Sequence, residues 1–282
     1  MVESLPLIVS LIVAGAIAPP ALAGLREQGL VRQNYRGAQV PFPAGLAIVV
    51  AALLALVPLA LADEIGGLDI FRPGTDRAVT YVLGVALLGL LDDMMGSRGG
   101  PSAPRGWRGH GRALLHGRLS TGAVKAGGSL GLALWTLHGA GYPTGEYLLA
   151  VALLVLATNL FNLLDLGPGR SLKALVLLGA GLTLGSFDLD PLWTLGLFAG
   201  PMLVLLPLDL RERGMLGDTG SNAVGAVAGL WLILTLSTEG QAIALAAVLA
   251  ATIYGEFRSI SAFVERTPGL RSLDSFGRSH AR

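Results

Sequence analysis

The sequence predicts an all-α, polytopic integral membrane helix bundle, and three observations favour this fold class. Of the 282 residues, 52% are hydrophobic and only 14% are charged, whereas soluble domains carry about 25% charged residues. The mean hydropathy is +0.65. Apolar runs close to the roughly 20 residues that cross a bilayer recur along the chain, between polar loops. We therefore expect a single transmembrane domain over residues 1–282.

About nine apolar segments are candidates for transmembrane helices. They lie at about residues 5–23, 44–62, 78–95, 121–139, 147–165, 171–187, 191–208, 220–236 and 241–263. The sixth is short, and the third is short unless it extends past its two aspartates, so these need helix ends that are buried in protein. Residues 96–120 form a Gly- and Arg-rich loop with too few apolar residues for a core of its own.

The positions of the cations predict the orientation of the bundle in the membrane. With the N-terminus outside, 18 of the 20 Lys and Arg residues fall on the cytoplasmic side, and only Arg72 and Arg77 fall outside. Cytoplasmic loops are enriched in these residues. The C-terminal tail, residues 264–282, is then cytoplasmic. The net charge of +1 and the absence of cysteine give no reason to expect a nucleic-acid partner or a thiolate metal site.

Two adjacent carboxylates, Asp92 and Asp93, end the third segment in the stretch GLLDDMM. Successive helical residues point about 100° apart, so the two side chains cannot face one point. Carboxylates near the membrane are costly and are functional candidates by default. The alternative is that they mark the water boundary and cap the loop, and the sequence leaves both interpretations open.

The fifth segment ends in TNLFNLLDLGPGR, in which Asn159, Asn162 and Asp165 recur at every third position. This spacing keeps the three side chains within a roughly 120° arc of one helix. A polar stripe on an apolar helix must face protein or a water-filled cavity. We therefore expect these groups to bind substrate, with hydrogen bonding between helices as the alternative.

The stretch MLGDTGSN, residues 215–222, precedes the eighth segment. Thr219 or Ser221 can cap the following helix, whose N-terminal amides attract phosphate. Asp218 beside that positive helix end offers a hard oxygen ligand that suits Mg²⁺, although a helix cap alone is the alternative. Arg36, at the entry to the second segment, is a candidate phosphate partner, but arginine is common at cytoplasmic helix entries.

Together these clusters predict a site for Mg²⁺ and a phosphate-bearing substrate. Acidic, amide and arginine side chains converge on one membrane face without a histidine or cysteine cage. Mg²⁺ is usually held by one or two carboxylates together with substrate oxygens. We expect Asp218 and Asp92 to be its ligands.

The order of the motifs resembles that of the polyprenyl-phosphate N-acetylhexosamine-1-phosphate transferases, the family that includes phospho-MurNAc-pentapeptide translocase and the GlcNAc-1-phosphate transferases. The resemblance rests on GLLDD, then N-x-x-N-x-x-D, then GDTGS, preceded by a basic-Gly and Pro-x-x-x-Gly entry to the second segment. It extends from about residue 34 to residue 225, with matching sidedness of the loops.

The resemblance implies a bacterial inner-membrane enzyme that transfers a sugar 1-phosphate from a UDP-sugar, such as UDP-HexNAc, to a polyprenyl phosphate. UMP is released, Mg²⁺ is required, and the product serves cell-envelope glycan synthesis. The resemblance implies catalytic roles for Asp92, Asp93 and Asp218, the last with Mg²⁺. It implies substrate binding by Arg36, Asn159, Asn162 and Asp165. A homodimer is one assembly that is compatible with this interpretation.

The chain departs from the family pattern in three places. Pro168 replaces a usual acidic residue, the histidine-rich motif of the last cytoplasmic loop is missing, and a tenth apolar segment is missing. One alternative is therefore a catalytically inactive relative that binds polyprenyl phosphate or a lipid-linked precursor as a scaffold or regulator. Another is a small-solute transporter, which would carry polar residues near mid-bilayer, whereas these clusters lie at one end of their segments.

Overall fold

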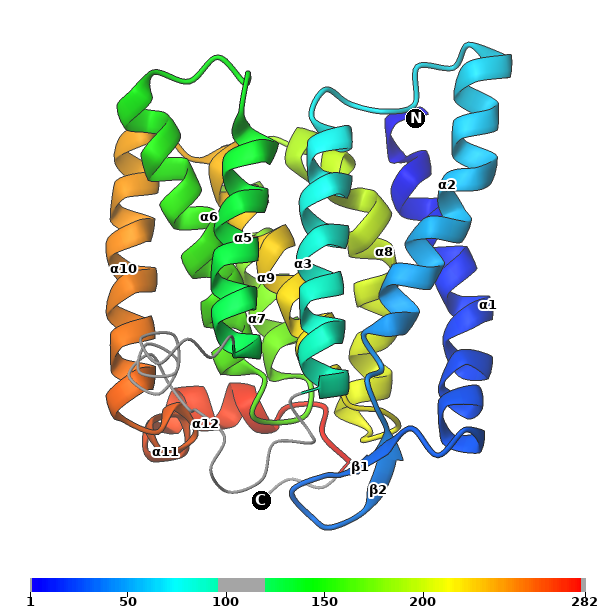
Figure 1. The fold of residues 1–282 in the computed structure, drawn as a ribbon, viewed down its shortest axis with the longest axis vertical. Coiled ribbons are helices and arrows are strands. Elements are labelled where there is room, and N and C mark those ends of the chain that lie inside the picture. The colour runs from blue at the N-terminus through cyan, green and yellow to red at the C-terminus, as the bar shows by residue number, and fades with distance from the viewer. Residues whose placement is uncertain (1, 96–119, 280–282) are drawn as a thin grey trace.

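The computed structural model describes residues 2–95 and 120–279. Within these ranges, nine helices of at least 17 residues run side by side as one bundle (Figure 1). They are α1 (Leu5–Glu27), α2 (Leu46–Gly66), α3 (Thr75–Met95), α5 (Thr121–Leu137), α6 (Thr144–Leu164), α7 (Arg170–Ser186), α8 (Asp190–Leu210), α9 (Gly217–Thr235) and α10 (Thr238–Phe257). The shorter elements are η1 (Val2–Ser4), β1 (Val31–Gln33), β2 (Gln39–Pro41), α11 (Ile260–Arg266) and α12 (Pro268–Ser275).

Six helices of the described chain are long and apolar enough to cross a membrane. They are α1 with η1, α2, α3, α6, α8 and α10. Large apolar side chains such as Val57, Ile243 and Phe257 remain exposed on these helices, as a lipid-facing surface requires. The prediction of a helical bundle with several membrane-length helices is thereby confirmed. Of the other three, α5 and α7 have 17 residues each and α9 has 19.

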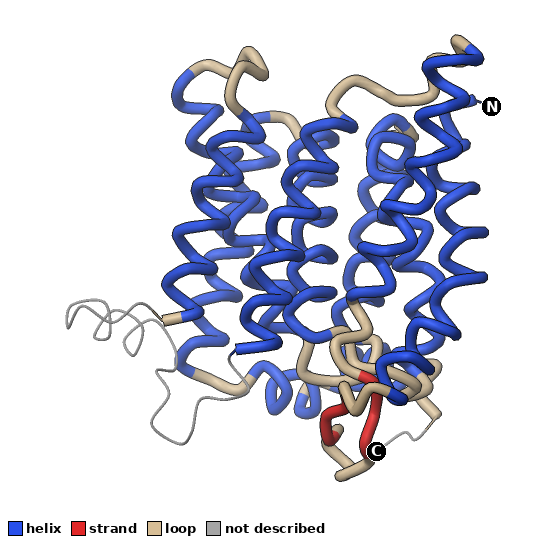
Figure 2. The backbone as a smooth tube through the Cα atoms, turned by 45° about the vertical axis from the view of Figure 1, so that its right-hand side comes forward, coloured by secondary structure: helices blue, strands red, loops and turns tan. Residues whose placement is uncertain are grey.

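One end of the bundle collects the polar elements. The β1–β2 hairpin, α11 and α12 gather there, whereas the start of α1 lies at the opposite end (Figures 1 and 2). The end of α3, the end of α6 and the start of α9 lie at the same polar end (Figure 1). Asp92, Asp93, Asp165 and Asp218 therefore belong to one end of the molecule, as the sequence predicts.

Helix α9 forms the centre of the bundle. Every residue from Thr219 to Ile233 is buried, and the helix packs against α3, α6, α7 and α8. Glycines allow backbones to meet directly at its N-terminal end. A Cβ added to Gly45 would lie 2.2 Å from the Gly220 nitrogen, and one added to Gly89 would lie 2.3 Å from the Asp218 carbonyl oxygen. The chain that enters α2 and the end of α3 are thus both in backbone contact with α9.

The structure differs from the sequence expectations in the ninth segment, in the C-terminal tail and in the first polar loop. The ninth segment, expected over 241–263, is two helices, because α10 ends at Phe257 and the Ser259 hydroxyl caps α11 by accepting from the Ala262 nitrogen at 3.2 Å. The tail contains α12, and the first polar loop contains the antiparallel hairpin in which Arg32 pairs with Val40. The loop expected over 96–120 lies almost wholly outside the described residues.

The contact at Gly89 predicts that Gly89→Ala destabilises the protein. The added methyl group meets backbone rather than a flexible side chain, and overpacking of this kind costs about 1–3 kcal/mol. Gly131→Ala is the matched control, because nothing lies within 4 Å of a Cβ at Gly131 and Ala is favoured over Gly in a helix. Thermal unfolding in detergent should give a lower midpoint for Gly89→Ala only; equal midpoints would contradict the α3–α9 contact.

Candidate functional site

Four helices bring polar side chains together beside the start of α9. Asp92 from α3 lies against Asp218 from α9 and against Thr121 from α5. The Lys125 ammonium on α5 donates to Asp218 Oδ2 at 2.5 Å. Asn162 from α6 interacts with Asp218 and donates to the Ser221 hydroxyl at 2.9 Å. We call Asp92, Lys125, Asn162 and Asp218 the carboxylate cluster.

The carboxylate cluster holds more negative than positive charge. Among the described residues, the two carboxylates of Asp92 and Asp218 share a single ammonium, that of Lys125. The side chains of Lys125 and Asp218 are 16% and 31% exposed, so the pair is open to water on one side. A partly buried group of two carboxylates with one counter-charge attracts a further cation.

Asp93 points away from Asp92, as the angle of about 100° between successive helical residues predicts, and it has a different role. Its Oδ1 accepts from the Asp218 nitrogen at 2.9 Å, and its Oδ2 accepts from the Thr219 nitrogen at 2.8 Å and the Thr219 hydroxyl at 2.7 Å. Asp93 is 5% exposed. It therefore caps the N-terminus of α9 from outside that helix, where a negative charge is stabilised by the helix dipole.

Asp165 lies in a cavity next to the carboxylate cluster. The cavity, of about 250 Å³, is also lined by Asn34, Asp209, Glu212 and Met215. Burial first, and then the charges of Asp209, Asp218 and Asp93, raise the pKa of Asp165 well above its ordinary value, while Arg170 opposes the shift. Asp209, in turn, accepts from the Gly169 nitrogen at 2.8 Å and so fixes the loop that follows Asp165.

Of the four residues predicted to bind substrate, Asn162 alone belongs to the carboxylate cluster; Asp165 lies in the neighbouring cavity, and Arg36 and Asn159 lie elsewhere. Arg36 lies in the hairpin turn, 44% exposed, with its Nη1 3.6 Å from Glu212 Oε1. Asn34 and Tyr35 bind the same carboxylate, at 2.5 Å and 2.9 Å, so Arg36 belongs beside the Asp165 cavity. Asn159 is half-buried on α6, and its amide makes no hydrogen bond within the described chain.

Two residues that are central to this end of the bundle, Lys125 and Asp209, are not among the predicted site residues. Lys125 enters the prediction only as one of the cations that set the orientation, although a cation inside an apolar helix is itself a functional signal. Asp209, near the end of α8 in the stretch LPLDLRERG, could have been found by the same reasoning as Asp165. Their partners, Asp218 and Gly169, are 93 and 40 residues away, a distance that no local motif covers.

The donor set of the carboxylate cluster fits Mg²⁺. The carboxylates of Asp92 and Asp218 adjoin each other, and the ion accepts one or two such ligands and completes its octahedron with water and phosphate oxygens. Across residues 2–95 and 120–279, no three His, Cys, Asp or Glu side chains are grouped so that they could hold a metal without such additional ligands.

Neither a protein-family model nor a curated protein matches the sequence.

The cap at α9 predicts that Asp93→Ala and Asp92→Ala have unequal effects on stability. Loss of the Asp93 carboxylate leaves three donors without their acceptor, and we expect it to cost about 2–4 kcal/mol. Asp92→Ala relieves repulsion from Asp218 and should change stability by less than about 1 kcal/mol. Chemical denaturation in detergent measures both, and similar losses for the two variants would contradict the separate roles.

The raised pKa of Asp165 predicts a stability that falls as the pH rises. The folded protein keeps the proton at pH values at which the unfolded chain, with a pKa of about 3.9, has lost it. The free-energy cost of keeping Asp165 protonated in the folded protein therefore grows from the unfolded-state pKa up to the folded-state pKa. Asp165→Asn should raise the thermal midpoint at neutral pH and flatten its pH dependence, whereas Glu64→Gln, at an exposed carboxylate on α2, should change neither. An unchanged pH profile in Asp165→Asn would refute this assignment.

Proposed function

We propose that this protein is a Mg²⁺-dependent membrane transferase that moves a sugar 1-phosphate from a UDP-sugar, such as UDP-HexNAc, to a polyprenyl phosphate. UMP is the second product. The observation that carries the proposal is the meeting of Asp92 and Asp218 at the polar end of the bundle, next to Asn162 and Lys125. Carboxylates, an amide and an ammonium are the groups that phosphoryl transfer between two anionic substrates requires.

The motif order supports the same assignment. GLLDD ends α3, the N-x-x-N-x-x-D stretch ends α6, and GDTGS begins α9. These are the motifs by which the chain resembles the polyprenyl-phosphate N-acetylhexosamine-1-phosphate transferases. Their convergence at one end of the bundle is what a common active site of that family requires, although GLLDD ends at residue 93 and GDTGS begins at residue 217.

The proposed reaction needs no covalent enzyme intermediate. An oxygen of the lipid phosphate forms a bond to the sugar-proximal phosphorus of the donor. The bond from that phosphorus to the bridging oxygen breaks, and this oxygen leaves on UMP. Asp92 accepts the proton of the lipid phosphate or orients that phosphate, while Lys125 and Asn162 bind phosphate oxygens. Asp93 acts by holding α9 in place, which makes it a positioning residue.

Asp92 and Asp218 are the residues that would hold Mg²⁺. When bound, the ion supplies the positive charge that stabilises the phosphate oxygens as negative charge moves onto the leaving group. The Lys125 ammonium, which neutralises Asp218 in the structure, then turns to the substrate phosphates. The Asp165 cavity lies beside the cluster and is the assigned place for part of the nucleotide.

The proposed setting is the cytoplasmic face of a bacterial inner membrane. We infer that all nine long helices cross the membrane, with the N-terminus outside. The excess of Arg and Lys on the loops at the polar end supports this orientation. The lipid substrate would reach the site from the bilayer and the nucleotide sugar from the cytoplasm.

The Lys125–Asp218 ion pair favours a second candidate function. A carboxylate that already holds an ammonium at 2.5 Å has less need of a metal. In this alternative the protein is an inactive relative that binds polyprenyl phosphate as a scaffold or regulator. It would be stabilised by the lipid without any release of UMP.

Release of UMP distinguishes the two functions. Purified protein with Mg²⁺, undecaprenyl phosphate and labelled UDP-GlcNAc or UDP-MurNAc-pentapeptide should produce UMP, and Asp218→Asn should abolish it. Asp92→Asn should lower kcat by about 10²–10⁴-fold, the usual contribution of a general base, while lipid binding persists. Asp76→Asn, at an exposed aspartate in the first turn of the same helix, is the matched control.

Absence of turnover with every donor, together with thermal stabilisation by undecaprenyl phosphate, would replace the transferase by the inactive relative. An unchanged kcat in Asp92→Asn would remove its role as base.

A further inference from the structure

The C-terminal helices close a second polar cavity at the same end of the bundle. It has a volume of about 530 Å³ and lies between the loop over 166–168, α11, α12 and the hairpin turn. We call it the arginine cavity. Its charged and aromatic lining consists of Tyr35, Arg170, Glu265, Arg271, Asp274 and Arg278.

Two guanidinium groups meet at the floor of the arginine cavity. A Cβ added to Gly167 would lie 2.9 Å from Arg278 Nη2 and 3.1 Å from Arg170 Nη2. Both arginines donate to the carboxylate of Asp274, Arg170 through Nε at 2.8 Å and Nη2 at 3.0 Å, and Arg278 through Nη2 at 2.6 Å. One carboxylate cannot neutralise two cations, so positive charge remains at this point.

The two arginines keep the Asp274 carboxylate in its ionised form. Burial alone would raise the pKa of Asp274, but the hydrogen bonds and charges of Arg170 and Arg278 outweigh it and keep that pKa below its ordinary value. The carboxylate is therefore ionised at neutral pH, and it holds the two guanidinium groups in fixed positions.

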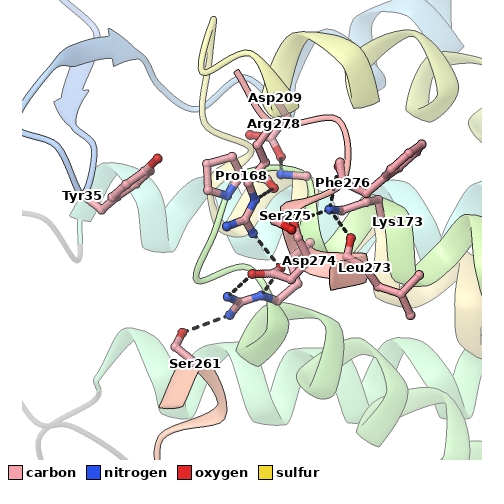
Figure 3. Close-up of polar contacts among 12 residues, drawn as sticks. Tyr35, Pro168, Lys173, Asp209, Ser261, Leu273, Asp274, Ser275, Phe276 and Arg278 are labelled. Carbon is pink, nitrogen blue, oxygen red and sulfur yellow. Dashed lines mark hydrogen bonds and ion pairs between the residues drawn. The ribbon is translucent and has the colours of Figure 1, made fainter. Parts of the chain in front are cut away.

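The wall formed by α12 is tied to the bundle by backbone contacts. The Lys173 ammonium donates to the carbonyl oxygens of Leu273, Asp274 and Phe276, at 2.8, 2.5 and 3.2 Å (Figure 3). Arg278 Nε donates to the Pro168 carbonyl oxygen at 3.1 Å. The cavity is thus preformed, which lowers the entropic cost of binding a ligand.

Donor groups for a ligand remain available in the cavity. Arg271 is exposed, and its guanidinium makes no hydrogen bond or ion pair within the described chain. Within the described chain, Arg278 donates through Nε and Nη2, which leaves Nη1 for a ligand. Tyr35 lies across the cavity from Arg278 (Figure 3), and its hydroxyl donates to Glu212 at 2.9 Å, which fixes the ring.

We propose that the arginine cavity binds the nucleoside end of a soluble nucleoside diphosphate, with Arg271 and Arg278 as partners of the nucleoside-proximal phosphate and the Tyr35 ring packing against the base, while the second phosphate extends to the carboxylate cluster. Arginine matches phosphate by paired hydrogen bonds. The volume falls within the roughly 300–1,000 Å³ of small-molecule sites and is far more than a single phosphate fills. This inference deepens the proposed function, on which it rests for the identity of the nucleotide as the UDP part of the donor.

Titration of UDP into the purified full chain in detergent, followed by calorimetry, tests the assignment. Arg271→Gln should weaken UDP binding by roughly tenfold or more, because a charge-assisted hydrogen bond is lost. Arg266→Gln is the matched control, since Arg266 is an exposed arginine at the end of α11 that does not line the cavity. The Arg271 guanidinium has no hydrogen bond or ion pair to lose within the described chain, so both variants should keep the wild-type thermal midpoint.

Short-chain phosphatidic acid is titrated in a parallel arm, because a lipid headgroup offers the same phosphate chemistry. Loss of phosphatidic acid binding in Arg271→Gln, with UDP affinity unchanged, would overturn the nucleotide assignment. Absence of UDP binding to the wild type would overturn it as well. UDP binding that depends on Arg271, without turnover of any donor, would refute the transferase function and keep the cavity assignment. Turnover together with UDP binding that does not depend on Arg271 would refute the cavity assignment and keep the transferase function.

Discussion

The contact between Asp93 and the first amides of α9 is the interaction on which the polar end of the bundle depends. Helix α9 is buried along its length, so its N-terminal amides cannot all be satisfied by water and need acceptors from the protein. Asp93 supplies two of these bonds from α3, and the positive helix end offsets the cost of burying the carboxylate. Because Asp92 precedes Asp93 on the same helix, satisfying α9 also places Asp92 beside Asp218.

Stability and function make opposite demands on the other acidic residues. The carboxyl groups of Asp92 and Asp218 lie against each other, and Asp165 is half-buried near Asp209 with a raised pKa. A bundle selected for stability alone would replace such groups by apolar or neutral residues. Their presence at one end, where four helices and a preformed cavity meet, is the pattern expected when charge is kept for binding anions and cations.

The sequence predicts the helices well because their signal is local, and it predicts the site only in part because its contacts are not. Apolar runs locate all nine long helices within a few residues, and helical geometry correctly separates Asp92 from Asp93. The break after Phe257 was missed because apolar residues continue through Ile260 and Val264, which hides a turn capped by one serine. Lys125, Asp209 and Asp274 were missed because each acquires its role from a partner on a distant helix, and Arg36 is drawn to Glu212 by a hairpin that the apolar pattern does not reveal.

The bond between Arg170 and Asp274 spans 104 residues, and this separation orders the biogenesis of the molecule. When α7 has been synthesised, Asp274 does not yet exist, so the Arg170 guanidinium at the start of α7 has no carboxylate to bind. It must stay hydrated at the membrane surface. The carboxylate cluster draws only on α3, α5, α6 and α9, so its contacts do not require the C-terminal helices. Asp209 of α8 holds the loop after Asp165 through the Gly169 nitrogen, but the arginine cavity closes only when α12 and Arg278 pack against that loop.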